Sequence, residues 1–283
     1  LGGVIVGYGI IFGTANGLGY AFSLQRAAEA NPERRGFALG WVTAAYALGG
    51  AVAAALLDGP IESAGTSRAL SSLALVIISA GLTAAVLLAG SGRSSSVRQE
   101  QIGPPALRQL VCRLWTGYGL ATVAGLMALG HAAAIVDQAG GPGSTATVLA
   151  GCASGAGGIW IALVANRSRI TGLITGLPLG SAVALGIGAL IDDGTVAVVV
   201  IVLVSSAYGA LIAAYPFAVN EIFGSERYPA IYGRVFTAWG AAGLIGPFGA
   251  GLLFDATGTY RLPLLFAAAA ALGSCVVGRR IAP

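Results

Sequence analysis

The stretch YGRVFTAWGAAGLIGPFGAG, residues 232–251, has the length and composition of a helix that crosses a membrane. A spanning helix needs about 20 mostly apolar residues, and this stretch has a single charged residue, Arg234, near its start. Its glycines leave room for a neighbouring helix to approach closely. Trp239 lies among them, somewhat deep for a residue of the interfacial aromatic belt. We expect Trp239 to face a cavity; packing between helices or contact with lipid is the alternative.

The rest of the chain is also rich in apolar residues and poor in charged residues. Of its 283 residues, 56% are hydrophobic and 9% are charged, whereas soluble domains contain about 25% charged residues. The formal charge of +4 does not indicate nucleic-acid binding, because the basic residues form short clusters between apolar runs. The sequence predicts an all-α membrane protein. The nine spans that we expect are residues 1–25, 36–57, 68–90, 110–136, 145–165, 170–191, 195–219, 230–254 and 260–278.

The distribution of arginine predicts how these helices are oriented. Cytoplasmic loops are enriched in basic residues. When alternate loops are assigned to one side, thirteen arginines fall on that side and only Arg68 and Arg261 fall on the other. We expect a multi-pass protein of the cell inner (cytoplasmic) membrane with its C-terminus in the cytoplasm. An odd number of spans with an outside start suggests that three helices precede Leu1 in the complete protein.

A polar segment rich in Ser, Gly and Arg separates the first three predicted spans from the last six. We predict three parts on this basis. They are a remnant of an N-terminal six-helix bundle at residues 1–91, a cytoplasmic linker at residues 92–108 and a C-terminal six-helix bundle at residues 109–283.

An internal repeat supports the division into two halves. ERRGFALGWVTAAYALGG, which starts at Glu33, matches ERYPAIYGRVFTAWGAAG, which starts at Glu226, at a constant offset of 193 residues. The alignment pairs Tyr46 with Trp239. Both segments follow a predicted inside loop, so the repeats run parallel and are related by an axis along the membrane normal. The repeat predicts that Tyr46 and Trp239 face one another across this axis.

Three segments resemble one transporter family. IFGSERYPAIYGRVFTAWGAAGLIGPFGAGLLFDATGTY (222–260) is similar to the tenth-to-twelfth helix region of the oxalate/formate antiporter group of the major facilitator superfamily. WTGYGLATVAGLMALGHAAAIVDQAG (115–140) resembles its seventh helix, and GTANGLGYAFSLQRAAEANPERRGFALG (13–40) resembles its fourth helix, the next loop and the fifth helix. The resemblance implies the major facilitator superfamily fold, with nine of twelve helices present, and a carrier that passes small organic anions by alternating access.

The sequence departs from this family at two positions. Oxalate-exchanging members are similar in using one basic residue in helix eight and another in helix eleven to hold a dianion. The matching positions here are Gly158 and Trp239. Many members of the broader group also have Trp at the second position, so the resemblance remains, but oxalate is not favoured as the substrate.

Several polar and aromatic residues in the spans are candidate substrate ligands. Tyr208 and Tyr215 are seven residues apart and therefore share one helix face, and Pro216 is expected to kink that helix. Asn16 either forms a hydrogen bond between helices or contacts substrate. A packed aromatic face is the alternative for the two tyrosines. The predicted substrate-binding residues are Trp239, Tyr46, Tyr208, Tyr215, Asn16 and His131.

Two further predictions concern charge. His131 is the only histidine, and it lies in the outer part of its helix, where it either senses protons, since histidine titrates near neutral pH, or forms a structural hydrogen bond. Arg234 and Glu221 lie at the inside ends of consecutive helices, so we predict a gating ion pair between them. The alternative is that the Arg234 side chain extends to the membrane interface.

The predicted function is secondary active transport of a small organic anion of the monocarboxylate type. The alternatives are a carrier for a neutral or amphiphilic solute, since no predicted span has a cation at mid-membrane, and a non-transporting remnant of such a carrier. We do not expect an enzyme, because the chain has one histidine and no catalytic or metal-binding motif. We expect no cofactor or metal, and a monomer whose partners are the substrate and the lipid bilayer.

Overall fold

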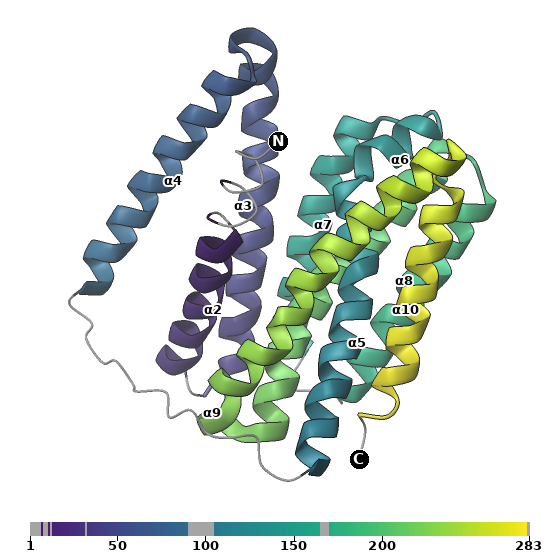
Figure 1. Ribbon diagram of the computed structural model, residues 1–283. Helices are drawn as coiled ribbons and strands as arrows, with labels where there is room; N and C mark the ends of the chain where they lie inside the picture. The colour runs from purple at the N-terminus through teal and green to yellow at the C-terminus, as the bar shows by residue number, and fades with distance from the viewer. Residues whose placement is uncertain are drawn as a thin grey trace.

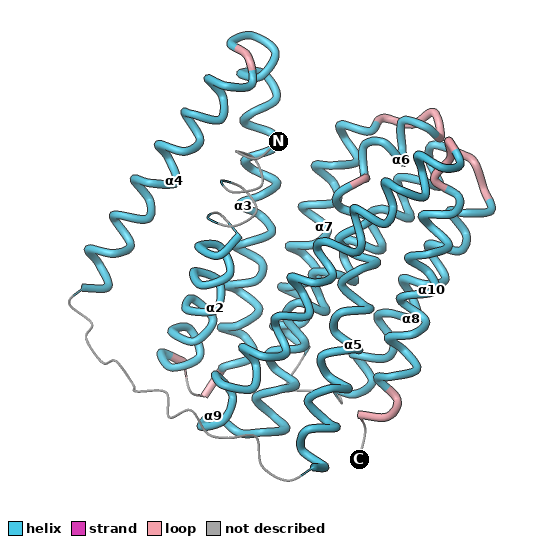
Figure 2. Tube along the Cα trace, viewed as in Figure 1, coloured by secondary structure: helices cyan, strands magenta, loops and turns pink. Residues whose placement is uncertain are grey.

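A computed structural model describes residues 13–31, 33–89, 105–164 and 170–281, together with Gly7 and Ile11. The described residues form helices joined by short turns and form no strand (Figure 2). Seven segments among them are long and apolar enough to cross a membrane, so the chain is an all-α, multi-pass membrane protein. These segments are Ser67–Leu87, Leu107–Gly130, Gly143–Val164, Gly172–Leu190, Gly194–Gly224, Glu226–Thr257 and Arg261–Gly278.

The first three labelled helices form a group of their own (Figure 1), which we call the N-terminal group. It consists of α2 (Gly13–Ala30), α3 (Arg35–Ala64) and α4 (Thr66–Ala89). A sharp turn at Gly65 joins α3 to α4, and the φ angle of 82° at this residue lies in the left-handed region that favours glycine. The described side chains of α4 are mostly apolar and nearly all exposed. Such a helix is suited to lipid on most sides.

The remaining helices form a second group, which we call the C-terminal bundle. It consists of α5 (Pro105–Gly130), α6 (Ala132–Gln138), α7 (Gly143–Val164), α8 (Ile170–Leu190), α9 (Gly194–Thr257) and α10 (Arg261–Gly278). The main packing partner of α5 is α9, α7 packs as extensively against α3 as against α9, and α8 packs along α10. Side chains buried in this bundle include Met127, Leu185, Ile201 and Leu211.

The longest helix, α9, consists of two helices that meet at Gly224. The φ and ψ angles of Gly224 are 73° and 164°, which interrupts the helical backbone at this residue. We call residues 194–223 the first arm and residues 225–257 the second arm, and we call the end of the bundle where they meet the Gly224 end. The start of α5, the turn between α2 and α3 and the C-terminus lie at the same end (Figure 1).

Small residues bring the backbones of the two groups close together where α3 meets α7. A Cβ atom built on Gly40 of α3 would lie 3.0 Å from the Cα atom of Ala162 and 3.0 Å from the carbonyl oxygen of Gly158, both in α7. One turn further along α3, the backbone nitrogen of Ala44 would lie 3.3 Å from a Cβ atom on Gly158. Glycine and alanine therefore allow α3 and α7 to approach backbone to backbone, as is typical of helix pairs in membranes.

The helix boundaries require several corrections to the expected spans. The span expected at 110–136 is divided at His131, where α5 gives way to the short helix α6. α3 extends to Ala64, beyond the expected end at residue 57, because one glycine is enough for the turn that follows. α5 begins at Pro105, inside the expected linker 92–108; residues 90–104 lie outside the described part of the chain.

The two earliest expected spans are not among the seven apolar segments. Residues 1–6, 8–10 and 12 of the span expected at 1–25 are outside the described part of the chain, and its described portion belongs to α2, which ends at Ala30. The span expected at 36–57 lies within the 30 residues of α3.

Candidate functional site

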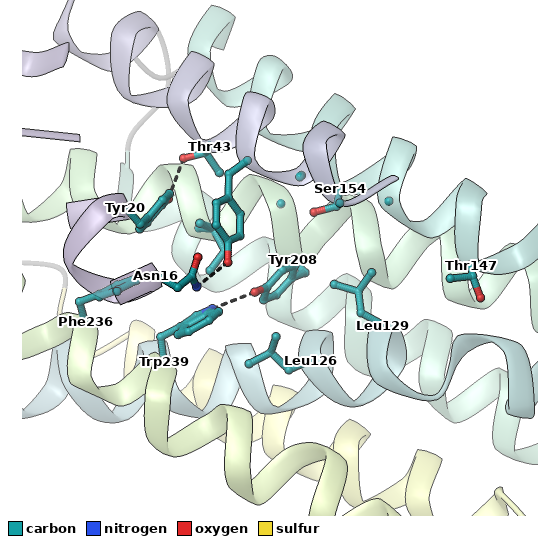
Figure 3. Close-up of a pocket in the computed structure, with 17 residues that line it drawn as sticks. Asn16, Tyr20, Thr43, Leu126, Leu129, Thr147, Ser154, Tyr208, Phe236 and Trp239 are labelled. Atoms are coloured by element: carbon teal, nitrogen blue, oxygen red, sulfur yellow. Dashed lines mark hydrogen bonds between the residues drawn. The ribbon is translucent and has the colours of Figure 1, made fainter. Parts of the chain in front are cut away.

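A cavity of about 320 Å³ lies between the two helix groups. Its walls come from α2 and α3 of the N-terminal group and from α5, α7 and both arms of α9 in the C-terminal bundle. Helices far apart in sequence therefore meet around one space (Figure 3). A volume of this size is at the lower end of the range that holds small-molecule ligands.

Stacked aromatic rings form one wall of the cavity. The rings of Phe236 and Trp239, in the second arm of α9, are nearly parallel, with centroids 5.6 Å apart and an interplanar angle of 6°. Tyr20 of α2 also stacks on Phe236, with the two ring centroids 5.3 Å apart. Tyr46 of α3 lies 5.2 Å from Tyr20. The wall therefore crosses from one helix group to the other and offers flat apolar faces to a ligand.

Hydrogen bonds fix the polar groups of the cavity. The indole N–H of Trp239 donates to the hydroxyl oxygen of Tyr208 at 2.8 Å, and the side-chain amide of Asn16 donates to the hydroxyl of Tyr46 at 2.8 Å. The hydroxyl oxygens of Tyr20 and Thr43 lie 3.0 Å apart. Figure 3 shows these pairs around the space. The bonds hold the aromatic rings in place and leave other lone pairs and protons of the same groups available to a ligand.

Close helix packing positions Tyr208. A Cβ atom on Gly209 would collide with the carbonyl oxygen of Ser154 in α7, and a Cβ atom on Gly157 would collide with the carbonyl oxygen of Ser206 in α9. Two glycines thus permit α7 and the first arm of α9 to cross at minimal distance. Gly125 of α5 gives the Tyr208 ring the space that a larger residue would occupy. The ring is consequently held between three helices.

None of the described residues that line the cavity is charged. The polar groups among them are the side-chain amide of Asn16, the hydroxyls of Thr43, Thr147 and Ser154, and the groups of Tyr20, Tyr46, Tyr208 and Trp239. These lining residues offer stacking, apolar contact and hydrogen bonds, and they offer no ion pair. A bound oxygen atom would find both donors and acceptors.

The cavity brings together four of the residues that the sequence singled out. Trp239, Tyr46, Tyr208 and Asn16 all line it. Trp239 and Tyr46, the aligned positions of the repeat, belong to opposite helix groups and share this space. That these residues bind a substrate stays a prediction. Gly158, which matches a basic position of the resembled family, is not among the lining residues and packs against Ala44 instead.

Tyr215 does not line the cavity. Its side chain is fully buried, and its ring centroid lies 4.5 Å from that of Tyr118 in α5. Seven residues span about 10 Å along a helix, so a small cavity can contact Tyr208 without reaching Tyr215. The backbone stays helical through Pro216, and the interruption comes at Gly224.

His131 also lies away from the cavity and joins three helices. Its Nε2 atom is 3.0 Å from the carbonyl oxygen of Pro247 in the second arm of α9, and its Nδ1 atom is 3.0 Å from the hydroxyl of Tyr260, the residue before α10. A carbonyl can only accept, so Nε2 carries a proton and donates to Pro247. In the tautomer with Nδ1 unprotonated, Nδ1 accepts from the Tyr260 hydroxyl. Burial, with a contribution from Asp255, raises the pKa of Tyr260, which keeps that hydroxyl protonated. These contacts match the structural alternative given for His131, and its roles in substrate binding or proton sensing stay predictions.

Arg234 and Glu221 form no ion pair in this conformation. An ion pair joins Arg26 to Glu29 instead, with the nitrogen and oxygen 3.3 Å apart. Both Arg234 and Glu221 are exposed near the Gly224 end. The gating role predicted for them therefore has no contact to support it here, and pairing in another conformation stays a prediction.

Comparisons with protein-family models and with curated proteins give no match to this chain.

Two residues that line the cavity, Phe236 and Tyr20, were not among the substrate-binding residues predicted from the sequence. Phe236 stacks on Trp239, and Tyr20 connects the aromatic wall to α2. Phe236 precedes Trp239 by three residues and therefore shares its helix face, so the spacing of the aromatic residues in the second arm was a usable signal. Tyr20 lies four residues after Asn16, and the same spacing could have placed it beside that candidate.

Proposed function

We propose that this protein is a secondary transporter that moves a small organic solute across the membrane by alternating access. The observation that carries this proposal is the position of the cavity between the N-terminal group and the C-terminal bundle. A ligand there would contact both groups at once. Relative movement of the groups would then close the cavity toward one side of the membrane and open it toward the other.

The contact between the groups is suited to such movement. α3 and α7 meet through glycine and alanine, and the hydrogen bonds that line the cavity lie within one group or the other. The Asn16–Tyr46 and Tyr20–Thr43 bonds join α2 to α3, whereas the Trp239–Tyr208 bond joins the two arms of α9. The groups can therefore shift without breaking these bonds.

The proposed fold is that of the major facilitator superfamily, as the sequence resemblance implies. The parallel repeat supports it, because its two aligned aromatic residues, Tyr46 and Trp239, line a common cavity. The clustering of arginines near the Gly224 end supports a cytoplasmic location for that end. One of these, Arg113, donates a hydrogen bond of 2.8 Å to the carbonyl oxygen of Arg280 beside the C-terminus.

The size and chemistry of the cavity favour a compact cargo with an apolar body and an oxygen-containing polar end. A small monocarboxylate meets this description, with its carboxylate held by hydroxyl and amide donors. The uncharged described lining favours a second candidate as well, a neutral solute of the same shape. Without a neighbouring cation, a buried carboxylate has a large desolvation cost, which a neutral amide or alcohol does not incur.

Uptake into proteoliposomes made with the purified full chain tests the proposal. The panel contains labelled benzoate, acetate and oxalate, with benzamide as the uncharged counterpart of benzoate. We expect saturable uptake of benzoate or benzamide and little uptake of oxalate. Trp239→Ala should abolish saturable uptake, whereas Trp160→Ala, which alters an exposed tryptophan outside the cavity, should not. Absence of saturable uptake across the panel, or equal uptake by the Trp239 variant, would count against the proposal.

A further inference from the structure

The hydrogen bonds around the cavity determine which polar atoms remain for a ligand. Trp239 donates to the hydroxyl oxygen of Tyr208, and an indole has a single N–H, which this bond uses. Tyr208 is the acceptor, and its own proton has no acceptor among the described residues. Trp239 therefore offers a cargo the face of its ring and orients the Tyr208 hydroxyl, which is the group that can donate.

The pair formed by Asn16 and Tyr46 leaves both a donor and an acceptor. The side-chain N–H of Asn16 donates to the Tyr46 hydroxyl at 2.8 Å, so the Tyr46 proton remains for a ligand. The Oδ1 atom of Asn16 has no hydrogen-bond partner in the described part of the chain and can only accept. This pair of the N-terminal group thus offers a hydroxyl proton and an amide oxygen.

Tyr20 and Thr43 have no hydroxyl proton left for a ligand. The Thr43 hydroxyl donates to the carbonyl oxygen of Leu39 in its own helix at 3.0 Å. Its single proton is thereby used, so Tyr20 is the donor in the 3.0 Å contact between the two hydroxyls. Among the described tyrosines of the cavity, donation to a cargo therefore falls to Tyr46 and Tyr208.

The remaining donors and the acceptor meet at one space. Tyr46, Tyr208 and Asn16 line the same cavity of about 320 Å³, and the two phenol groups lie close enough to interact electrostatically. Figure 3 shows the Asn16 amide and the Trp239–Tyr208 bond around this space. The stacked rings of Phe236 and Trp239 form its wall, and none of the described lining residues is charged. The site therefore presents hydroxyl donors, an amide acceptor and flat apolar faces.

We propose that the cargo is a flat, uncharged molecule with a primary carboxamide. Its carbonyl oxygen has two lone pairs, which would accept from Tyr46 and Tyr208, and its N–H would donate to Oδ1 of Asn16. One oxygen atom would thus connect the N-terminal group to the C-terminal bundle. A carboxylate has acceptors alone, so it would leave Oδ1 of Asn16 unpaired and would lose its hydration without gaining a cation. This substrate class rests on the proposed transport function, while binding is measured separately from transport.

Binding of three matched probes to the full chain in lipid nanodiscs tests the substrate class. The probes are benzamide, acetophenone and benzoate at neutral pH, and equilibrium dialysis measures the Kd of each. Acetophenone keeps the carbonyl and replaces the amide nitrogen by a methyl group, whereas benzoate replaces it by a charged oxygen. We expect benzamide to bind about five-fold more tightly than acetophenone and about ten-fold more tightly than benzoate, because a buried group left unpaired weakens binding.

Variants assign the contacts to individual side chains. Tyr208→Phe should weaken benzamide and acetophenone binding together, by about five-fold, because both carbonyl oxygens lose the same donor. Asn16→Leu should remove the advantage of benzamide over acetophenone, because the acceptor for the amide N–H is gone. Tyr260→Phe, which removes a phenol hydroxyl outside the cavity, should keep all three affinities. The comparison of probes on the wild-type chain does not depend on the folding of any variant.

The carboxamide assignment and the transport proposal can fail separately. Benzoate or acetophenone bound as tightly as benzamide, unchanged binding in Tyr208→Phe, or no binding of any probe would overturn the assignment. Saturable uptake of benzoate without binding of benzamide would support transport and overturn the substrate class. Selective binding of benzamide without uptake into proteoliposomes would overturn transport and leave the carboxamide site standing.

Discussion

The indole N–H of Trp239 donates a 2.8 Å hydrogen bond to the hydroxyl of Tyr208, joining the two arms of α9 across the cavity. The two residues are 31 positions apart and lie on opposite sides of the Gly224 interruption. This bond fixes the edge of the indole toward the first arm and leaves its face stacked on Phe236. The geometry of the aromatic wall therefore depends on both arms of one hairpin-like element.

The Trp239–Tyr208 bond should appear as an energetic coupling between the two side chains. Trp239→Phe keeps an aromatic ring against Phe236 and removes the N–H donor, while Tyr208→Phe removes the acceptor. A net contribution of about 0.5–1.5 kcal/mol is typical of such a bond, and we expect a coupling of this size in a double-mutant cycle. Denaturant unfolding in detergent micelles measures it. Additive single effects would contradict the bond.

Gly209→Ala should destabilise the protein severely. The new methyl group would collide with the backbone carbonyl of Ser154, and a backbone atom cannot move aside as a flexible side chain can. Overpacking of this kind costs about 1–3 kcal/mol or more, and the displaced α7 should disturb the cavity as well. Gly176→Ala in α8 is the matched control, because nothing lies within 4 Å of a Cβ atom there. Equal melting temperatures of the two variants would contradict the close crossing.

Gly224→Ala should weaken the junction between the arms of α9. The φ of 73° and ψ of 164° at this position belong to a region populated almost only by glycine. We expect a loss of about 1–3 kcal/mol from this strain, although a Cβ atom would meet no neighbour within 4 Å. Gly233→Ala, at an equally open site within the second arm, serves as the comparison. Thermal unfolding of both variants measures the difference, and a Gly224 variant as stable as the wild type would exclude strain.

His131→Leu should lower stability and leave cargo affinity unchanged. The substitution removes both hydrogen bonds that tie the start of α6 to Pro247 and Tyr260. Two such bonds are worth about 1–3 kcal/mol together. Tyr260→Phe, which removes one of them, should show a smaller loss. The measurements are Tm in detergent and KM for uptake; a KM shift of more than about five-fold would return His131 to the binding site.

The sequence predicted the helices well and their interruptions poorly. Apolar composition identifies a spanning segment, but it does not reveal that one residue is enough for a turn, as at Gly65 and Gly224. The intervals between the expected spans at 58–67 and 220–229 are therefore mostly helical in the structure. The division at His131 was equally hidden, because the residues on both sides of it are apolar.

For the cavity, the repeat was the most informative signal. It paired Tyr46 with Trp239 before any contact was known, and both residues line the same space. Helix periodicity placed Tyr208 and Tyr215 on one face, but it contains no information on how far along the helix a cavity extends. The partners of His131 come from α9 and α10, more than one hundred residues away. No local pattern reports such contacts.

The surface shared by α3 and α7 has a mechanical consequence. Side chains that interlock must change rotamers before two helices slide, and each such change adds to the friction between them. Gly40, Ala44, Gly158 and Ala162 have no rotamers to change. Along this line the two groups can slide without rotamer changes, so the side chains that must move during a pivot are those at other contacts between the groups, such as Tyr20 against Phe236 and Leu48 against Gly155.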